Sequence, residues 1–166
     1  GHLRIARLNG DGSIDPTFLP PRFAGDARGA DGFVSAILVY PTNSPNAGKI
    51  LIGGGFTSFE GLQRNGLARL NRDGSLDPTF FPGTGASGPV RAMMFMGDER
   101  IVIAGDFTTF NDINSSGMAR LNHDGSLDES FFVGTGSDGR VWTLALETNV
   151  FGLEKILAGG EFLFFN

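Results

Sequence analysis

Three stretches of this chain repeat one another without gaps, and an internal repeat restricts the possible folds more than any other feature of the sequence. They begin at Ala6, Ala68 and Ala119, and each reads Ala-Arg-Leu-Asn-x-Asp-Gly-Ser, then Ile or Leu, then Asp, two more residues and Phe. The starts lie 62 (68 minus 6) and 51 (119 minus 68) residues apart. A period of this size predicts a row of similar structural units that bury their apolar surfaces against one another.

Two further blocks recur in the same order and indicate strands. The first covers 34–40, 90–96 and 141–147, and the second covers 49–56, 100–107 and 155–162. The first block is apolar on both faces in places, which predicts a strand buried on two sides. The aligned stretches supply a third strand, at 3–8, 67–70 and 118–121, and the Asp-Gly after it is a hairpin-turn signal because Gly accepts a positive φ. The residues up to Pro-Thr-Phe or Glu-Ser-Phe are candidates for a short fourth strand.

The composition agrees with short strands joined by tight turns, since the 166 residues include 26 Gly and 16 Phe. Three or four antiparallel strands per unit predict an all-β fold of β-propeller blades, with three blade repeats in the chain. We expect one repeat domain over residues 1–166. Its full repeats run approximately over 34–89 and 90–140, and two complementary blade halves lie at 3–33 and 141–166.

The aligned stretches, each of the later two preceded by Gly-Gly-Phe-Thr or Gly-Asp-Phe-Thr, closely resemble the bacterial delta-60 repeat family. That family is regarded as propeller-forming, occurs mostly in large secreted or surface proteins, and has no established biochemical activity. The resemblance covers nearly the whole chain. It implies a propeller fold and an extracellular or cell-surface location, and it implies no particular ligand.

The two blade halves suggest how the repeats are completed. Residues 141–162 are candidates to pair with residues 3–18 and so complete one blade, which would bring the content of the chain to three blades. Three blades are too few to close a ring. We therefore expect either a part of a longer parent chain or a homodimer that forms a six-bladed propeller about a two-fold axis, with exchange of the terminal strands as a variant.

The charge pattern argues against several classes of partner. The net charge is −5, and no run of basic residues is present, so we expect no nucleic-acid partner. No apolar stretch approaches the 18 residues of a membrane span, and we expect no membrane insertion. Cysteine is absent, which excludes disulfides, thiolate metal sites and cysteine nucleophiles.

The repeated turn is rich in oxygen atoms and is a candidate calcium site at Asn71, Asp73 and Asp77. When Gly74 takes the sixth position of an EF-hand loop, positions 1 and 12 become Arg69 and Phe80, so the essential acids are missing. We favour an Asx-type turn, in which Asp and Ser side chains cap backbone N–H groups, and we expect no metal.

Other motifs that suggest a cofactor or catalysis have a structural explanation. Gly-x-Gly-x-x-Gly occurs at 83–88 and 134–139, but a strand is predicted to follow it where a dinucleotide site needs a helix. His123 occupies a turn position that is Gly10 or Arg72 in the other copies. We therefore expect no cofactor, no histidine-based catalytic triad and no enzymatic activity.

Comparison of the copies separates structural positions from candidate binding positions. Residues that are identical in every copy are expected to build the blade, with the repeated Arg linking neighbouring strands or blades and Phe56, Phe107 and Phe162 wedged between sheets. The copies differ directly after the first-strand Val, where Ser35, Arg91 and Trp142 stand. They also differ in the connection 19–33 and in the first hairpin loops, at 41–48, 97–99 and 148–154.

These observations favour a non-enzymatic structural or protein-interaction module that presents variable loops on a propeller scaffold. An alternative is a carbohydrate-binding module that uses those loops and Trp142, although an inter-blade role for this Trp is favoured. A weaker alternative is a hydrolase or lyase with carboxylates in the central channel. The expected partners are a second copy or the rest of a parent chain, and a protein or glycan ligand.

Overall fold

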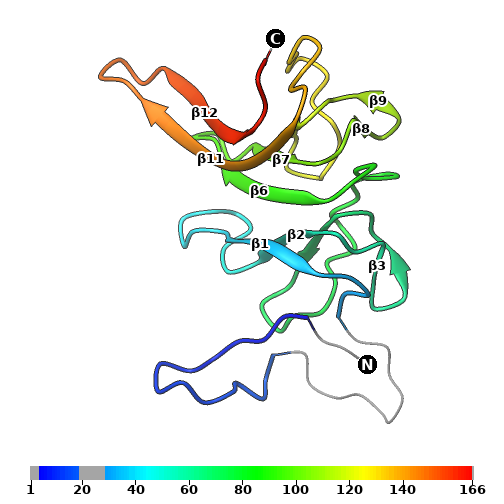
Figure 1. Cartoon of the computed structure of the whole chain (residues 1–166). Helices are drawn as coiled ribbons and strands as arrows, with labels where there is room; N and C mark the ends of the chain where they lie inside the picture. Colours follow the sequence, from blue (N-terminus) through cyan, green and yellow to red (C-terminus); the bar gives the residue numbers. More distant parts are fainter. Residues whose placement is uncertain (1–3, 19–28, 166) are drawn as a thin grey trace.

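The computed structural model describes residues 4–18 and 29–165, and this part of the chain consists of strands and turns without a helix (Figure 1). The predicted all-β class is confirmed. The strands, in chain order, are β1 (Val34–Val39), β2 (Ile50–Gly54), β3 (Ser58–Phe59), β4 (Leu62–Gln63), β5 (Leu67–Leu70), β6 (Val90–Phe95), β7 (Ile101–Gly105), β8 (Thr109–Phe110), β9 (Ile113–Asn114), β10 (Met118–Leu121), β11 (Arg140–Thr148) and β12 (Glu154–Glu161).

Two antiparallel sheets of three strands form complete blades. Their strand orders are β1-β2-β5 and β6-β7-β10, and the pairing of β2 with β5 has the same register as that of β7 with β10. Ile52 faces Ala68 in the first blade, as Ile103 faces Ala119 in the second. β11 and β12 form a two-stranded sheet that corresponds to the first two strands of a blade. The predicted order of three strands per repeat is therefore confirmed in the two full repeats.

Burial on both faces is complete in the central strand of both full blades, and the prediction that assigned it to the first strand is wrong for β1. All residues of β2 and β7 are buried, because a strand that is central in its sheet and lies between two neighbouring layers has no solvent side. β1 instead alternates between half-buried and exposed residues. β6 is an edge of its sheet as β1 is, but none of its residues is exposed, because it lies between β1 and β11.

Apolar cores lie between successive layers of the molecule. One core joins the two complete blades and includes Leu67, Phe80, Ile103 and Leu121. A second joins residues 5–18 to the first blade, and a third joins the second blade to β11 and β12. Phe56 and Phe107 are only 2 % exposed within these cores, which confirms their predicted position as wedges between sheets.

A short hairpin follows the wedge Phe in both full repeats and was not predicted. β3 pairs with β4, and β8 pairs with β9. The segment predicted as a fourth strand forms only isolated bridges, such as Leu70 with Leu76. Strand pairing is absent there because the segment turns back onto its own blade within a few residues.

The layers are arranged in chain order. Figure 1 shows residues 4–18 at one end of the molecule and β11 and β12 at the other, with the two complete blades between them. Among the described residues, β12 pairs with β11 only, so one chain does not make the predicted pairing of 141–162 with 3–18. Residues 4–8 contribute one isolated bridge, from Leu8 to Ile14, while Leu3 lies outside the described residues. That the two blade halves complete one blade stays a prediction, and the halves would have to come from two different chains.

Candidate functional site

A β-bulge interrupts the first strand of each blade at the three predicted binding positions. The ladder to the second strand shifts register between Val34 and Ala36, and the same shift recurs at the equivalent positions of β6 and β11. The residues left without a ladder partner are Ser35, Arg91 and Trp142. A bulge turns the side chain of its extra residue out of the regular alternation, and bulges are common beside binding sites.

The structure brings two of these three residues into direct contact. The Arg91 guanidinium carbon lies 4.9 Å from the centre of the Trp142 ring and 5.1 Å from that of Phe33. The cation therefore contacts one aromatic ring from each of the two blades that flank its own. Each such contact contributes about 0.5–1 kcal/mol at an exposed position. Trp142 is 41 % exposed and Phe33 is 44 % exposed, so the rings also present free surface.

Ser35 lies on the other side of the same row. Its Oγ donates a hydrogen bond of 2.7 Å to the backbone carbonyl of Val90, the residue before Arg91. Ser35 thus links the first strand of one blade to that of the next. All three predicted residues belong to one row across the first strands, although only Arg91 and Trp142 touch.

Two acids, Asp106 and Glu161, lie beside the arginines of this group. Arg91 donates through Nε and Nη2 to Asp106 Oδ2, at 3.1 and 2.6 Å. Arg140 lies 3.9 Å from the same oxygen and 3.6 Å from Glu161, and its guanidinium carbon is 5.9 Å from the Trp142 ring centre. Asp106 Oδ1 is buried and has no hydrogen-bond partner in the described structure. We name Phe33, Arg91, Asp106, Arg140 and Trp142 the aromatic–arginine cluster.

Sequence reasoning missed Phe33, Asp106, Arg140 and Glu161, although a usable signal existed. Phe33 and Arg140 occupy the position directly before the first-strand Val, and the three copies differ there. Asp106 and Glu161 occupy the position directly before the wedge Phe, and the copies differ there too. Gly55 replaces the acid in the first repeat. An added Cβ there would lie 2.4 Å from the Phe33 ring, so an acid at this position would require the ring to move.

The cluster is suited to binding by contact. Exposed aromatic faces can stack on an apolar ring, and the guanidinium and carboxylate groups at their edges can pair with hydroxyl or charged groups of a ligand. A pyranose sugar has this combination of an apolar face and a polar rim. A peptide side chain with an aromatic or charged end has it as well.

The turn with the calcium candidates forms the predicted Asx turn. Asp73 Oδ1 accepts hydrogen bonds from the backbone N and the Oγ of Ser75, at 3.0 and 2.6 Å, and the same pair of bonds recurs in the other two copies. Asn71 donates through its side-chain amide to Ser75 Oγ. Asp77 instead faces cations, with its Oδ2 2.7 Å from Arg69 and 2.8 Å from Lys49. The described residues contain no group of three or more metal-ligating side chains.

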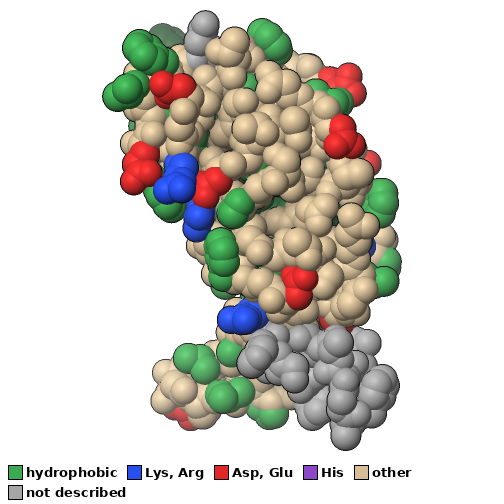
Figure 2. Space-filling model, turned by 45° about the vertical axis from the view of Figure 1, so that its right-hand side comes forward, with side chains coloured by type: hydrophobic (Ala, Val, Ile, Leu, Met, Phe, Trp, Pro, Cys, Tyr) green, Lys and Arg blue, Asp and Glu red, His purple; other side chains and the backbone are tan. Residues whose placement is uncertain are grey.

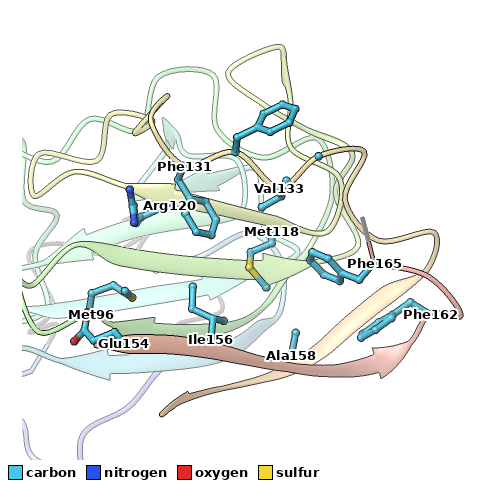
Figure 3. Close-up of a pocket in the computed structure, with 12 residues that line it drawn as sticks. Met96, Met118, Arg120, Phe131, Val133, Glu154, Ile156, Ala158, Phe162 and Phe165 are labelled. Carbon is cyan, nitrogen blue, oxygen red and sulfur yellow. The ribbon is translucent and has the colours of Figure 1, made fainter. Parts of the chain in front are cut away.

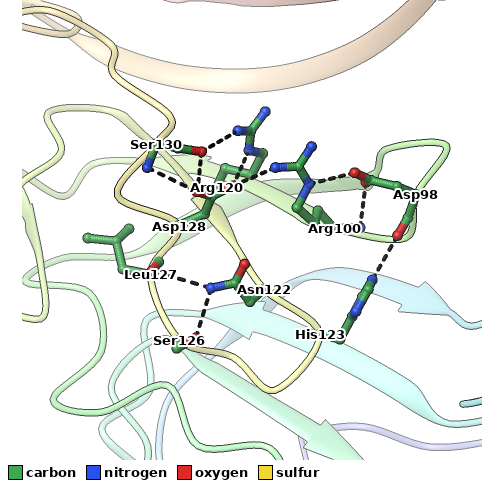
Figure 4. A network of polar contacts seen from close by, with 9 residues as sticks. All are labelled: Asp98, Arg100, Arg120, Asn122, His123, Ser126, Leu127, Asp128 and Ser130. Carbon is green, nitrogen blue, oxygen red and sulfur yellow. Dashed lines mark hydrogen bonds and ion pairs between the residues drawn. The ribbon is translucent and has the colours of Figure 1, made fainter.

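The equivalent network of the second blade is drawn in Figure 4. Asp128 Oδ2 accepts from Arg120 and Arg100, and its Oδ1 accepts from the hydroxyl and backbone N of Ser130. The hydrogen bonds from Ser130, assisted by the two guanidinium groups, hold the pKa of Asp128 well below its ordinary value, although burial opposes them. Burial alone would raise the pKa of Asp77, but hydrogen bonds from Lys49, Thr79 and Arg69 outweigh it and lower that pKa too.

The repeated Arg links neighbouring layers, as predicted. Arg69 Nη1 donates to the backbone carbonyl of His123, at 2.7 Å, and Arg7 Nη1 donates to that of Arg72, at 2.5 Å. Both acceptors are the variable residue of the turn in the following repeat. His123 has a structural position, because its Nε2 lies 2.7 Å from the Asp98 carbonyl (Figure 4).

The Gly-x-Gly-x-x-Gly segments connect blades. β6 follows the first segment and β11 follows the second, so the helix that a dinucleotide site requires is replaced by a strand. Gly85 has a φ of 79°, and an added Cβ would lie 2.5 Å from the backbone oxygen of Asn65. The glycines therefore allow a close backbone approach between blades. Of the variable connection 19–33, residues 19–28 lie outside the described residues.

One family model matches the chain. Its description is "Domain of unknown function (DUF5122) beta-propeller", and it covers residues 1–18, 48–80 and 97–131. These segments hold the aligned stretches and the second strands of the full repeats. No curated protein matches the chain, and no solved structure does. No helix of the described residues is long and apolar enough to cross a membrane.

Proposed function

This chain belongs to the DUF5122 β-propeller family, which corresponds to the delta-60 repeat family, and we propose that it acts as a non-enzymatic interaction scaffold. In this proposal the repeated residues build the blades, and the residues that differ between copies bind a partner. The propeller belongs to a secreted or surface protein of a bacterium, a location that rests on the family resemblance alone.

The observation that carries the proposal is the aromatic–arginine cluster. Every member comes from a position at which the copies differ, and two members sit at β-bulges. The repeated acids Asp77 and Asp128 pair with arginines of their own blades, as Asp106 does with Arg91, so it is the exposed rings of Trp142 and Phe33 that set the cluster apart. Polar groups that satisfy one another stabilise a scaffold, whereas exposed aromatic rings beside charged groups are available to a ligand.

A carbohydrate is the ligand class that this surface favours. Trp142 and Phe33 leave two-fifths or more of their surface exposed, while Arg91, Asp106 and Arg140 place hydrogen-bonding groups beside them. Such sites are weak one at a time, so we expect affinities in the micromolar to millimolar range for single sugars.

Fluorescence of the single Trp tests this proposal directly. Titration with a panel of neutral and acidic oligosaccharides should change the emission of Trp142 in a saturable way for at least one member. The variant Arg91→Ala should lose that response, while Arg72→Ala, which removes an exposed Arg from a turn far from the cluster, should keep it. A panel without any saturable response, or equal responses of both variants, would contradict the carbohydrate assignment.

A catalytic role has a weaker basis. Asp106 belongs to the cluster, and Arg140 lies within 4 Å of both Asp106 and Glu161. We expect no turnover of glycan substrates by the purified chain. Product formation that disappears in Asp106→Asn would replace the scaffold proposal by the hydrolase or lyase alternative.

A further inference from the structure

An apolar groove of about 820 Å³ lies at one end of the row of blades, between β10 and β12. Its walls include Met118, Phe131, Ile156, Ala158 and Phe162 (Figure 3). The described strands leave one edge of β12 unpaired along this groove, so its backbone N–H and C=O groups are open to a further strand.

Between the two complete blades, the space equivalent to this groove is filled. The counterparts of the groove residues are Leu67, Phe80, Ile101, Ile103 and Phe107, and they are 0–2 % exposed. They are covered there by β10 and the turn that follows it, whose Ala119, Leu121 and Leu127 belong to the same apolar core. The groove therefore has the shape of a blade without its third strand.

The chain carries the segment that fits this position. Residues 5–14 repeat the sequence of β5 and β10 and of the turn after them, with Ala6, Leu8 and Ile14 at the positions of Ala119, Leu121 and Leu127. Ile5 is buried against the first blade of its own chain. Leu8 and Ile14 are 59 % and 71 % exposed, so the opposite face of the segment is apolar and uncovered. Figure 2 shows such hydrophobic side chains on the segment beside the grey atoms.

We infer that the groove binds residues 5–14 of a second copy of this chain as the third strand of its last blade. One chain does not fill its own groove, because the segment and the groove lie at opposite ends of the molecule (Figure 1). The register follows from the complete blades, in which Ile103 faces Ala119 and Ile101 faces Leu121. Ala158 accordingly faces Ala6 of the second copy, and Ile156 faces its Leu8.

Charged groups support the same occupant. Lys49 pairs with Asp77 at 2.8 Å, and Arg100 pairs with Asp128 at 2.7 Å. The equivalent Lys155 has no ion-pair partner among the described residues, and Asp15 of the second copy is the acid at the corresponding position. Asp15 directly follows the segment and thus brings the acid that the groove lacks.

A second polar group points to the same segment. Arg7 and Arg69 each use Nη1 to reach the variable turn carbonyl of the following repeat. Arg120, which lines the groove, makes its recorded side-chain bonds through Nε and Nη2. In the register inferred above, the backbone carbonyl of Gly10 of the second copy is placed to accept a hydrogen bond from Arg120 Nη1.

Two chains that bind each other in this way close upon themselves. A two-fold pair places the segment of each copy in the groove of the other, so both grooves are filled. With three blades from each chain, the product is a six-bladed ring. The segments need not leave their own chains, because the face toward the first blade stays buried while the outer face enters the groove of the partner.

Light scattering during gel filtration of the full chain tests the pairing. We expect a mass of about 35 kDa, twice the 17.6 kDa of one chain. Leu8→Asp places a charge in the groove and should weaken the association at least about tenfold. Val150→Asp is the matched control, because Val150 is 94 % exposed in the turn between β11 and β12 and outside the groove; its mass should remain that of the dimer.

A disulfide cross-link tests the surface and the register independently of any folding defect in Leu8→Asp. The chain has no Cys, so Ala6→Cys and Ala158→Cys chains, when mixed and oxidised, should yield one covalent dimer on a non-reducing gel. A mixture of Ala6→Cys and Val150→Cys chains should not. A monomeric chain, a mass that keeps rising beyond the dimer with concentration, or a dimer without the specific cross-link would each overturn the inference.

Discussion

Single repeated residues in this protein act mainly on their own blade and on its neighbour. Asp77 is 2 % exposed and receives Arg69, Lys49 and Thr79, so the buried carboxylate is paired on both oxygens. Removing one partner from such a group commonly costs about 3–5 kcal/mol, because the remaining charge is left buried. The need to pair a buried carboxylate with a cation explains why Arg and Asp recur together in every copy.

These carboxylates make the stability of the fold dependent on acid. The pKa values of Asp77 and Asp128 are lowered in the folded state, and that of Asp31 is lowered to about 2, so the unfolded chain takes up protons first as the pH falls. Their contribution to the free energy of unfolding is complete above the ordinary Asp value of about 3.9 and is lost as the pH falls through the folded values. Urea unfolding between pH 6 and pH 2 should therefore show a steep loss of stability below about pH 4.

The variant Asp77→Asn separates this effect from a general loss of charge balance. It should be less stable than the native chain at neutral pH and should lose less stability between pH 5 and pH 2. Glu129→Gln is the control, since Glu129 is exposed, and its pH profile should follow that of the native chain. An Asp77→Asn profile parallel to the native one would contradict the assignment.

The bulge in the first strand is the structural element that separates scaffold from candidate site. It recurs in β1, β6 and β11 at the same ladder position and always lies opposite a glycine of the second strand. An added Cβ on Gly105 would lie 2.0 Å from the carbonyl oxygen of Pro89, which is a backbone atom that cannot move aside cheaply. The glycine is therefore a condition for the bulge, and the bulge turns Arg91 toward Trp142.

Replacement of that glycine should destabilise the blade. Gly105→Ala is expected to lower the free energy of unfolding by about 1–3 kcal/mol, the usual cost of overpacking. Gly10→Ala is the matched control, because nothing lies within 4 Å of an added Cβ there and the other copies carry Arg or His at this position. Chemical unfolding followed by circular dichroism measures both, and equal stabilities of the two variants would refute the role given to the glycine.

The whole molecule is a row of layers whose two ends differ from its middle. Residues of the middle core such as Ile101 and Leu121 are fully buried, whereas Leu8 at one end and Leu157 at the other are more than half exposed. Repeats that contact only their neighbours leave apolar surface at each end of the row unless something covers it. In the pair inferred above, each end of one chain covers the opposite end of the other.

This arrangement makes thermal stability dependent on protein concentration. Association with a second copy stabilises the folded state by mass action, so the Tm should rise as the concentration of the native chain increases. The Tm of Leu8→Asp should be lower and should rise less with concentration. A concentration-independent Tm in the native chain would argue against the pair, whereas the same rise in Leu8→Asp would place the contact elsewhere.

Much of the fold could be predicted by comparing the three copies of the repeat, because matching residues make the same local contacts in each copy. Identical turns, Asp-Gly pairs and strand blocks predicted the blades, the Asx turns and the linking Arg residues, all of which depend on residues close in the chain or on one recurrent contact. The short hairpins β3–β4 and β8–β9 escaped prediction because they consist of two-residue strands with little apolar alternation.

The candidate site was predictable in part. Ser35, Arg91 and Trp142 stood out because the copies disagree there, and comparison of the residues before each Val and wedge Phe would have added Phe33, Asp106 and Arg140. Which of these touch required three-dimensional structure, because contacts between blades join residues some 50 positions apart, such as Arg91 with Trp142.

The internal repeat by itself determines the blade, its strand order and the number of copies in the chain. The separation of residues 4–18 from β12 emerged only from the packed structure. The physical reason is that a repeat specifies how each layer packs on the next, and the position of the two ends is the accumulated result of all these contacts. The four layers do not bring the ends together, so the complementary halves of one repeat lie at opposite ends of the same molecule.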